Sequence, residues 1–253
     1  MTLTDARLTF HKPSNIDIMK NFYNHINVKP DVIQYPTWGA YMAKYMDNVE
    51  HSTLFGALLA TGLWSVEHIT TVMRTYHVGA TDEGWSVFAQ IDANNQMRTA
   101  RMQLYGFDAK PIGRQRWLHF ELKVQGILPD SFRLSQCPFG EDEIARYPNL
   151  TVCVVPDEAT ALTCKLFLSD YVWLAVGRWL RSDMLQCLQG RNVLIFPDKN
   201  LFEDWERTAK QIHGCKSLAV VKWCDRSEER RSIADSLIED DSWRLHTRPV
   251  LTA

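Results

Sequence analysis

The sequence contains no close pair of cysteines. Its six cysteines are spread through the chain without a Cys-x-x-Cys spacing, which argues against a zinc module and against a disulfide framework. Free cysteines in apolar runs behave as small hydrophobic residues, so we expect reduced core residues in a cytoplasmic protein. They are Cys137, Cys153, Cys164, Cys187, Cys215 and Cys224.

Long apolar segments are also missing. The longest one, Leu54 to Trp64, is too short to span a bilayer and is interrupted by Gly56, Thr61 and Gly62. The first residues, MTLTDARLTF, do not have the basic and then apolar layout of a signal peptide. We therefore expect a soluble protein without a membrane partner.

A third absence is an excess of positive charge. The chain has 28 Lys and Arg against 30 Asp and Glu, so its net charge of -2 gives no general attraction to nucleic acid or to anionic lipid. Apolar residues make up 45% of the chain, which excludes general disorder. A nucleic-acid partner would have to be held by a local patch.

Three regions are expected along the chain. Residues 1–51 form an N-terminal extension in which Asn15–His25 fits a short helix, while Pro30, Pro36 and Gly39 interrupt the segment that follows. Residues 52–148 form an α+β subdomain, and residues 149–253 form an α/β domain.

The α+β subdomain begins with a helical pattern over Ser52–Tyr76 that is split at Gly62, with Ser65 as N-cap of the second helix. Two alternating segments, Trp85–Ile91 and Met97–Tyr105, flank turn-forming residues and predict a β-hairpin. The stretch Trp117–Gln125 fits either a further strand or a helix.

The last third of the chain alternates apolar strands with helices, a pattern typical of a parallel sheet covered by helices on both faces. The predicted strands are Val152–Val155, Val172–Val176, Val193–Phe196 and Leu218–Val221. The predicted helices are Glu158–Leu168, Ser182–Leu188, Phe202–His213 and Glu228–Ile238, the last capped by Ser227. The predicted class is therefore α/β.

Acidic residues follow two of these strands. Asp157 and Glu158 come after the first strand, and Asp198 and Asn200 come after the third. Ligands of parallel sheets bind at the carboxyl ends of strands, and oxygen ligands suit Mg²⁺, so the four residues form a candidate metal site. The alternative is that Asp157 and Asp198 cap the segments they precede, which their spacing alone favours.

The order of these elements resembles that of a known protein family. The segments VVPDEATALTCKLF, LAVGRW and LQGRNVLIFPDKNLFEDWERTAKQI resemble a Toprim domain, and more closely an uncharacterised family of bacterial mobile-element proteins with primase-like Toprim domains. The resemblance covers roughly Tyr76 to Ile238. It implies a basic, template-guiding subdomain before the Toprim domain, and Mg²⁺- or Mn²⁺-dependent phosphoryl transfer with Glu158 and Asp198 as catalytic residues.

This sequence departs from that family in three ways. Pro156 stands where Toprim domains place the catalytic glutamate, and Asn200 stands where they place the second aspartate of Asp-x-Asp. A proline can neither bind metal nor transfer a proton, and each lost carboxylate removes charge that a two-metal site needs. The zinc module of related proteins is also missing, because no Cys/His cluster precedes Cys137.

A basic, aromatic stretch fits the template-guiding subdomain. Its cations and interleaved rings are Arg98, Arg101, Tyr105, Phe107, Lys110, Arg114, Arg116, Trp117 and Lys123. Cations for phosphates and rings for bases suit single-stranded DNA. The alternative is a solvated strand face whose arginines pair with acids. Further on, Arg178-Trp179-Leu180-Arg181 could meet phosphate beside Asp198, or could equally be a surface loop.

Three functional hypotheses follow. The first is a nucleic-acid-binding protein of mobile-element origin with an impaired Toprim site. The second is a working Mg²⁺-dependent primase or nuclease. The third is a phage- or plasmid-encoded regulator that binds a protein partner and keeps only the fold.

Overall fold

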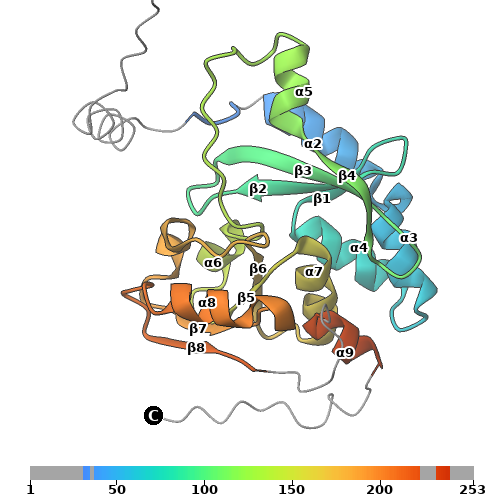
Figure 1. Ribbon diagram of the computed structural model, residues 1–253. Coiled ribbons are helices and arrows are strands. Elements are labelled where there is room, and N and C mark those ends of the chain that lie inside the picture. Colours follow the sequence, from blue (N-terminus) through green and yellow to red (C-terminus); the bar gives the residue numbers. More distant parts are fainter. Residues whose placement is uncertain (1–30, 35–36, 223–231, 240–253) are drawn as a thin grey trace, which may run out of the picture.

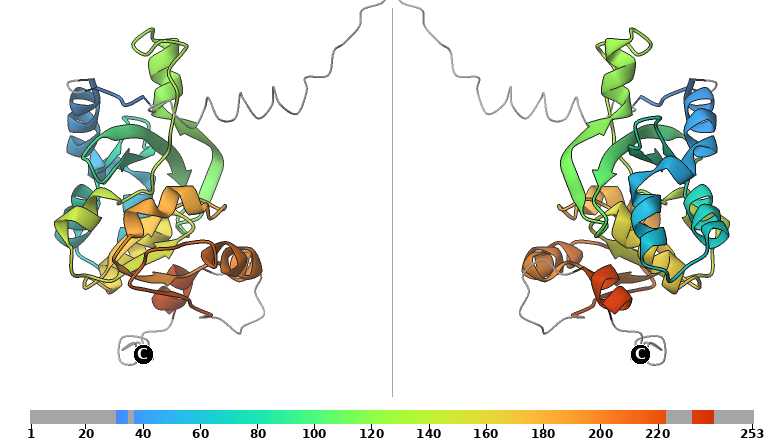
Figure 2. Two further views of the ribbon diagram at one scale, coloured as in Figure 1. Left: turned by 90° about the vertical axis from the view of Figure 1, so that its left-hand side faces the viewer. Right: turned by 90° about the vertical axis from the view of Figure 1, so that its right-hand side faces the viewer.

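A computed structural model gives the arrangement of the chain and describes residues 31–34, 37–222 and 232–239 (Figure 1). The helix expected at Asn15–His25 and the residue Cys224 lie outside these ranges. Within these ranges the fold is built on one antiparallel and one parallel sheet, each of four strands. In Figure 2 the helix α5 (Leu118–Val124) projects from the antiparallel sheet, away from the parallel one.

The antiparallel sheet has the order β1-β2-β3-β4. Its strands are β1 (Val78–Ala80), β2 (Ser86–Ile91), β3 (Met97–Tyr105) and β4 (Pro111–Trp117). The predicted hairpin is confirmed as β2 and β3, which pair from Ser86↔Gln103 onward. The open choice at Trp117–Gln125 is resolved because Trp117 ends β4 and α5 follows directly.

Within the described residues, four helical segments precede this sheet in the chain. They are α2 (Thr37–Asp47), the 3-10 turn η1 (Val49–His51), α3 (Thr53–Ala60) and α4 (Val66–Thr75). The split at Gly62, whose φ is +70°, and the Ser65 cap, which accepts a hydrogen bond from the His68 amide at 3.2 Å, are confirmed. The expected break at Gly39 was wrong, since this residue lies within α2.

The parallel sheet confirms the predicted α/β class. Its strands β5 (Val152–Val155), β6 (Val172–Ala175), β7 (Asn192–Ile195) and β8 (Ser217–Val220) lie in the order β6-β5-β7-β8. Alternate residues of β5 enter different cores. Cys153 and Val155 pack on the side of α7 (Glu158–Phe167) and α9 (Ile233–Glu239), and Val152 and Val154 pack toward α8 (Phe202–Ala209).

Three helix predictions need correction. The segment Ser182–Leu188 is a 3-10 helix (η2) with a non-helical Leu185, because its apolar residues reach the sheet without a regular turn. The helix expected to reach His213 ends at Ala209. The last helix begins at Ile233, after a reciprocal cap in which the Asp235 amide donates to Ser232 Oγ at 3.2 Å and Asp235 Oδ2 accepts from the Ser232 amide at 2.9 Å.

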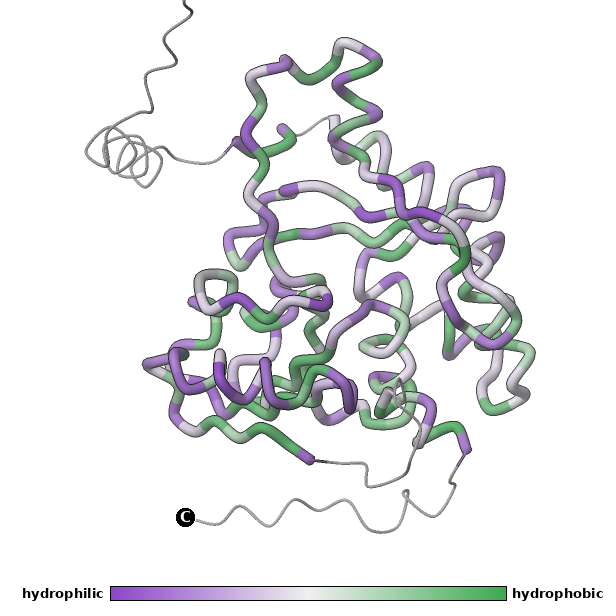
Figure 3. The backbone as a smooth tube through the Cα atoms, in the orientation of Figure 1, coloured by the Kyte–Doolittle hydropathy of each residue, from purple (hydrophilic) through white to green (hydrophobic). Residues whose placement is uncertain are grey.

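Helix α8 could be predicted because its apolar residues recur at helical spacing on one side. Trp205 and Ala209 are buried against the parallel sheet, while Glu203, Asp204 and Glu206 face solvent. Figure 3 shows the resulting hydrophilic colouring along α8. Of the described cysteines, Cys137, Cys153 and Cys164 are buried in the core as expected, whereas Cys187 and Cys215 are only partly buried.

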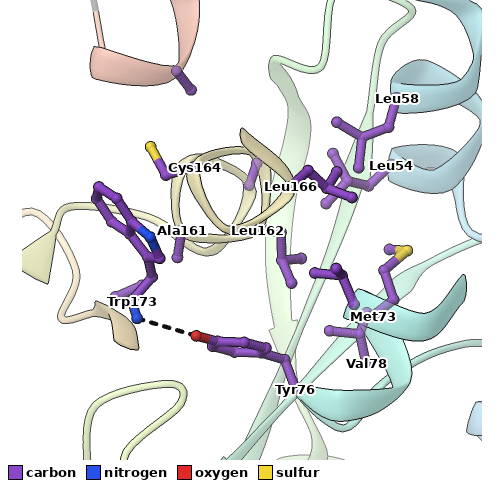
Figure 4. Close-up of a cluster of buried hydrophobic side chains, with 14 of the residues drawn as sticks. Leu54, Leu58, Met73, Tyr76, Val78, Ala161, Leu162, Cys164, Leu166 and Trp173 are labelled. Carbon is purple, nitrogen blue, oxygen red and sulfur yellow. Dashed lines mark hydrogen bonds between the residues drawn. The ribbon is translucent and has the colours of Figure 1, made fainter. Parts of the chain in front are cut away.

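The two sheets share one apolar core that crosses the expected boundary between residues 148 and 149. Figure 4 shows α7 packed between the Leu54–Leu58 side of α3 and the strand that carries Trp173. The Trp173 amide donates to the Tyr76 hydroxyl at 3.0 Å. Phe139 forms an antiparallel bridge with Ala175, its amide and carbonyl bonding at 2.9 and 3.1 Å. The domain boundaries themselves stay a prediction.

Candidate functional site

The acids at the strand ends lie at one edge of the parallel sheet. β5 and β7 are neighbours and run in the same direction, so Asp157 and Asp198 follow adjacent carboxyl ends. The chain leaves β5 toward β6 on one side and then crosses to β7 on the other, which makes this edge the topological switch point where ligands of such sheets bind. We call Asp157, Glu158, Asp198 and Asp235 the carboxylate rim.

Asp157 caps α7, as the capping interpretation predicts. Its Oδ1 accepts from the Thr160 amide and its Oδ2 from Thr160 Oγ1, both at 2.9 Å. These bonds engage both carboxylate oxygens and satisfy a donor at the start of the helix.

Glu158 is buried and forms an ion pair with Arg101 of β3, which also approaches the Tyr105 hydroxyl at 3.4 Å. Burial raises the pKa of Glu158, while the Arg101 guanidinium opposes that rise. The pair joins the two sheets. It places a fixed internal cation against Glu158, one of the two carboxylates expected to be catalytic in this chain.

Asp198 occupies the N-cap position of the 3-10 turn η3 (Lys199–Leu201) but makes no side-chain capping bond. Its Oδ1 is buried without a hydrogen-bond partner among the described residues. Burial raises the pKa of Asp198 to about 7, and Asp157 and Asp235 add to the rise, whereas Lys110 and Arg178 oppose it. This carboxyl group therefore carries a proton over much of the range below neutrality.

The raised pKa of Asp198 predicts a pH-dependent stability. Above about pH 4 the unfolded chain ionises at this position while the folded protein keeps its proton, so the free energy of unfolding decreases as the pH rises through the folded pKa. Between pH 5 and pH 7.5 we expect Asp198 to account for about 2–3 kcal/mol of this decrease. Urea unfolding at both pH values measures the decrease, and the variant Asp198→Asn should lose the part that is due to Asp198. The same decrease in the variant as in the wild type would refute the assignment.

The residues of the rim do not fit a metal centre. No group of three or more His, Cys, Asp or Glu side chains in the described ranges could hold a metal ion. Asp157 is engaged in capping and Glu158 in its ion pair, while Asn200 is exposed on η3. Of the expected ligands, Asp198 keeps a buried oxygen that has no partner among the described residues.

Two of the expected nucleic-acid-binding cations are committed to internal pairs. Arg101 holds Glu158, and Arg98 donates to Asp92 Oδ2 through Nε at 2.9 Å and Nη2 at 2.6 Å. Asp92 Oδ1 in turn accepts from the amides of Asn94 and Gln96, which closes the hairpin turn. The alternative given for this stretch, arginines paired with acids, therefore describes both arginines of β3.

The remaining cations lie on or near β4, an edge strand whose residues 111–116 are all exposed. Arg114 forms no ion pair with a described residue, and Arg116 pairs with Glu121 and lies over the Trp85 ring at 5.1 Å. Lys110, directly before the strand, donates to both carboxylate oxygens of Asp235 at 2.6 and 2.7 Å. We call Lys110, Arg114 and Arg116 the β4 surface.

Two other residues expected to contact nucleic acid, Trp117 and Lys123, are less accessible. Trp117 is half-buried, and Lys123 donates to the carbonyls of Asp130 and Phe132 at 2.9 and 3.1 Å. Phe107, in the loop between β3 and β4, is 92% exposed. Sequence reasoning missed Asp235, the partner of Lys110, because a contact across 125 residues leaves no local signal.

The loop after β6 carries a further pair at the same edge. Arg178 and Trp179 are exposed, and the guanidinium lies over the indole at 5.7 Å. No helix in the described ranges combines the length and apolar character that a bilayer crossing needs.

The fold is that of primase catalytic cores. The structure of the DnaG catalytic core aligns with a TM-score of 0.53 at 12% identity, covering 81% of this chain and 76% of that one. The DnaG primase catalytic domain bound to single-stranded DNA gives 0.52 at 12% identity, over 81% and 77% of the two chains. The E. coli primase catalytic core gives 0.50 at 13% identity, again over 81% and 77%. The expected Toprim-like architecture is thus confirmed as a fold.

Searches by sequence add a family but no function. No curated protein matches the chain. A family model described as a domain of unknown function, DUF6371, matches residues 52–199. That range takes in α3 to the end of β7 and includes Glu158, Asp198 and the β4 surface. Because the match spans more than half of the chain, this protein belongs to the DUF6371 family.

Proposed function

We propose that this protein binds single-stranded nucleic acid on a primase-like scaffold whose phosphoryl-transfer site is impaired. The observation that carries the binding part is the edge strand β4, which is exposed from residue 111 to 116, with Arg114 free of ion pairs with described residues. Phosphate contacts dominate the affinity for nucleic acid, and exposed arginines are suited to make them. The sequence resemblance to mobile-element proteins supports an origin in such an element.

Three features support impaired catalysis. Pro156 replaces the expected glutamate, Glu158 is held by Arg101, and Asp157 caps α7. A working primase or nuclease with Glu158 and Asp198 would need Glu158 to leave a buried ion pair before it could hold Mg²⁺ or take part in proton transfer. The Mg²⁺-dependent alternative is therefore the less supported one.

The binding proposal is tested by the double variant Arg114→Ala/Arg116→Ala with a fluorescein-labelled (dT)20 oligonucleotide. Losing two phosphate contacts should reduce the slope of log affinity against log salt by about 1.4, and the affinity at low salt by roughly tenfold. Fluorescence anisotropy over a range of salt concentrations measures both quantities.

The matched control is Arg207→Ala, which removes an exposed arginine from α8, away from the β4 surface. It should leave affinity and salt slope close to the wild-type values. No detectable binding of (dT)20 by the wild-type protein at low salt would end the proposal. An equal effect of the control would show that binding does not depend on β4.

A second candidate function is that of a regulator bound to a protein partner. The observation that favours it is an apolar group on and just after α5, where Phe120, Val124 and Ile127 are 60%, 90% and 44% exposed. Exposed apolar groups of this kind occur at protein interfaces. Recovery of nucleic acid alone, without a stoichiometric protein partner, would count against this function.

A further inference from the structure

The loop after β6 presents an aromatic ring to solvent at a fixed place. Gly177, with φ of +81°, turns the chain at the end of β6, and Trp179 follows with 65% of its surface exposed. An indole is a large apolar surface, so exposing it costs free energy unless a ligand covers it. The neighbouring residues do not bury this ring.

The loop is anchored on both sides of the exposed ring. Trp205 of α8, 1% exposed, donates its Nε1 hydrogen to the Arg178 carbonyl at 3.0 Å. Leu180 is buried in the core beneath the other side of the loop. Trp179 therefore stands on backbone that is already ordered, which lowers the entropy lost when a ligand binds.

Arg178 supplies a cation beside the ring. Its guanidinium lies 5.7 Å from the Trp179 ring centroid and forms no ion pair with a described residue. Arg178 follows the carboxyl end of β6, which pairs in parallel with β5, so it lies at the same edge of the parallel sheet as Asp157 and Asp198. Arg101 of β3, whose partner in the register with β4 is Trp117, reaches Glu158 at this same edge, which connects the edge with the β4 surface.

We propose that Trp179 stacks on an unpaired base and that Arg178 contacts a phosphate next to it. The loop then continues the path of a nucleic-acid strand that is bound on β4. This inference rests on the proposed function and extends it to the edge of the parallel sheet. Ring and guanidinium together match the two parts of a nucleotide, since every base offers a π face and every linkage a negative charge.

The test compares (dT)20 with an abasic oligonucleotide of the same length in the anisotropy assay. Trp179→Ala should lower the affinity for (dT)20 by about tenfold and leave the affinity for the abasic strand unchanged, because only the base contact is lost. Trp179→Phe should keep most of the (dT)20 affinity. Arg178→Ala should weaken binding of both strands, because the phosphates remain in each.

A matched control is Tyr147→Ala, which removes another partly exposed ring with a cation, Lys165, over it at 5.6 Å. Tyr147 precedes β5 and so lies at the opposite edge of the sheet; its variant should bind (dT)20 like the wild type. If Arg114→Ala/Arg116→Ala weakens binding and Trp179→Ala does not, the loop inference is wrong while the proposed function stands. If the wild type binds neither strand, both fail.

Discussion

Replacing Arg101 with methionine is expected to lower the free energy of unfolding by about 3–5 kcal/mol, because it leaves the buried Glu158 carboxylate without its counter-charge. The arginine also holds β3 of one sheet to the first turn of α7 on the other. The loss should be smaller at pH 5 than at pH 8, since Glu158 can then take up a proton at less cost. Urea unfolding at both pH values measures the two effects.

The double variant Arg101→Met/Glu158→Leu separates the cost of an unpaired charge from the loss of packing. Removing both charges should restore most of the lost stability, because the desolvation of the carboxylate disappears with it. The control is Lys44→Met, which breaks an exposed pair with Asp82 and should cost no more than about 1 kcal/mol. A loss in Arg101→Met as small as in this control would show that the pair contributes little.

The Arg101–Glu158 pair also explains how the fold accommodates a buried carboxylate at Glu158. A carboxylate buried at a strand end needs a cation nearby or a proton. Here the chain itself supplies the cation from β3, whereas Asp198, which forms no ion pair with a described residue, has its pKa raised to about 7. Of the two acids expected to be catalytic, Glu158 is thus stabilised by an ion pair, whereas Asp198 has a raised pKa that favours its protonated form.

The elements predicted well are those whose pattern is local. The β2–β3 hairpin follows from alternation around a turn, and the strands of the parallel sheet follow from short apolar runs between helices. β4 was missed because PIGRQRW is exposed at every position except Trp117 and so has no apolar alternation. Helix α2 was missed because Gly39 argues against a helix locally, whereas burial of Met42 and Tyr45 against the sheet favours one.

The site was predictable in its place but not in its chemistry. Asp157, Glu158 and Asp198 follow predicted strand ends, so their shared edge could be inferred, whereas Asp235 on α9 could not. The partner of Glu158 lies 57 residues earlier, and no local spacing shows that Arg101 turns inward rather than toward solvent. Arg98 likewise turns inward to pair with Asp92. From the sequence alone, the basic stretch therefore looks more exposed to solvent than it is.

Gly140→Ala is the second substitution with a large expected effect, about 3–5 kcal/mol of destabilisation, because two costs combine at one position. Gly140 has φ of +82°, a left-handed conformation that costs an L-residue about 1–2 kcal/mol. An added Cβ would also lie 2.8 Å from the Trp173 carbonyl oxygen and 2.8 Å from the Tyr76 ring, in a packed junction. Both neighbours belong to the contact that joins α4 to the parallel sheet, so the ring cannot move without disturbing its bond to Trp173.

The control for Gly140 is Gly190→Ala, where φ is +73° and nothing lies within 4 Å of the added Cβ. It carries the conformational cost alone, so the difference between the two variants measures the steric part. Chemical unfolding of both variants gives that difference, and near-ultraviolet circular dichroism should show altered aromatic packing only for Gly140→Ala. Equal losses of unfolding free energy in the two variants would mean that the residues packed around Gly140 can shift at little cost. The shared core of the two sheets would then be less rigid than the contacts of Tyr76 and Trp173 imply.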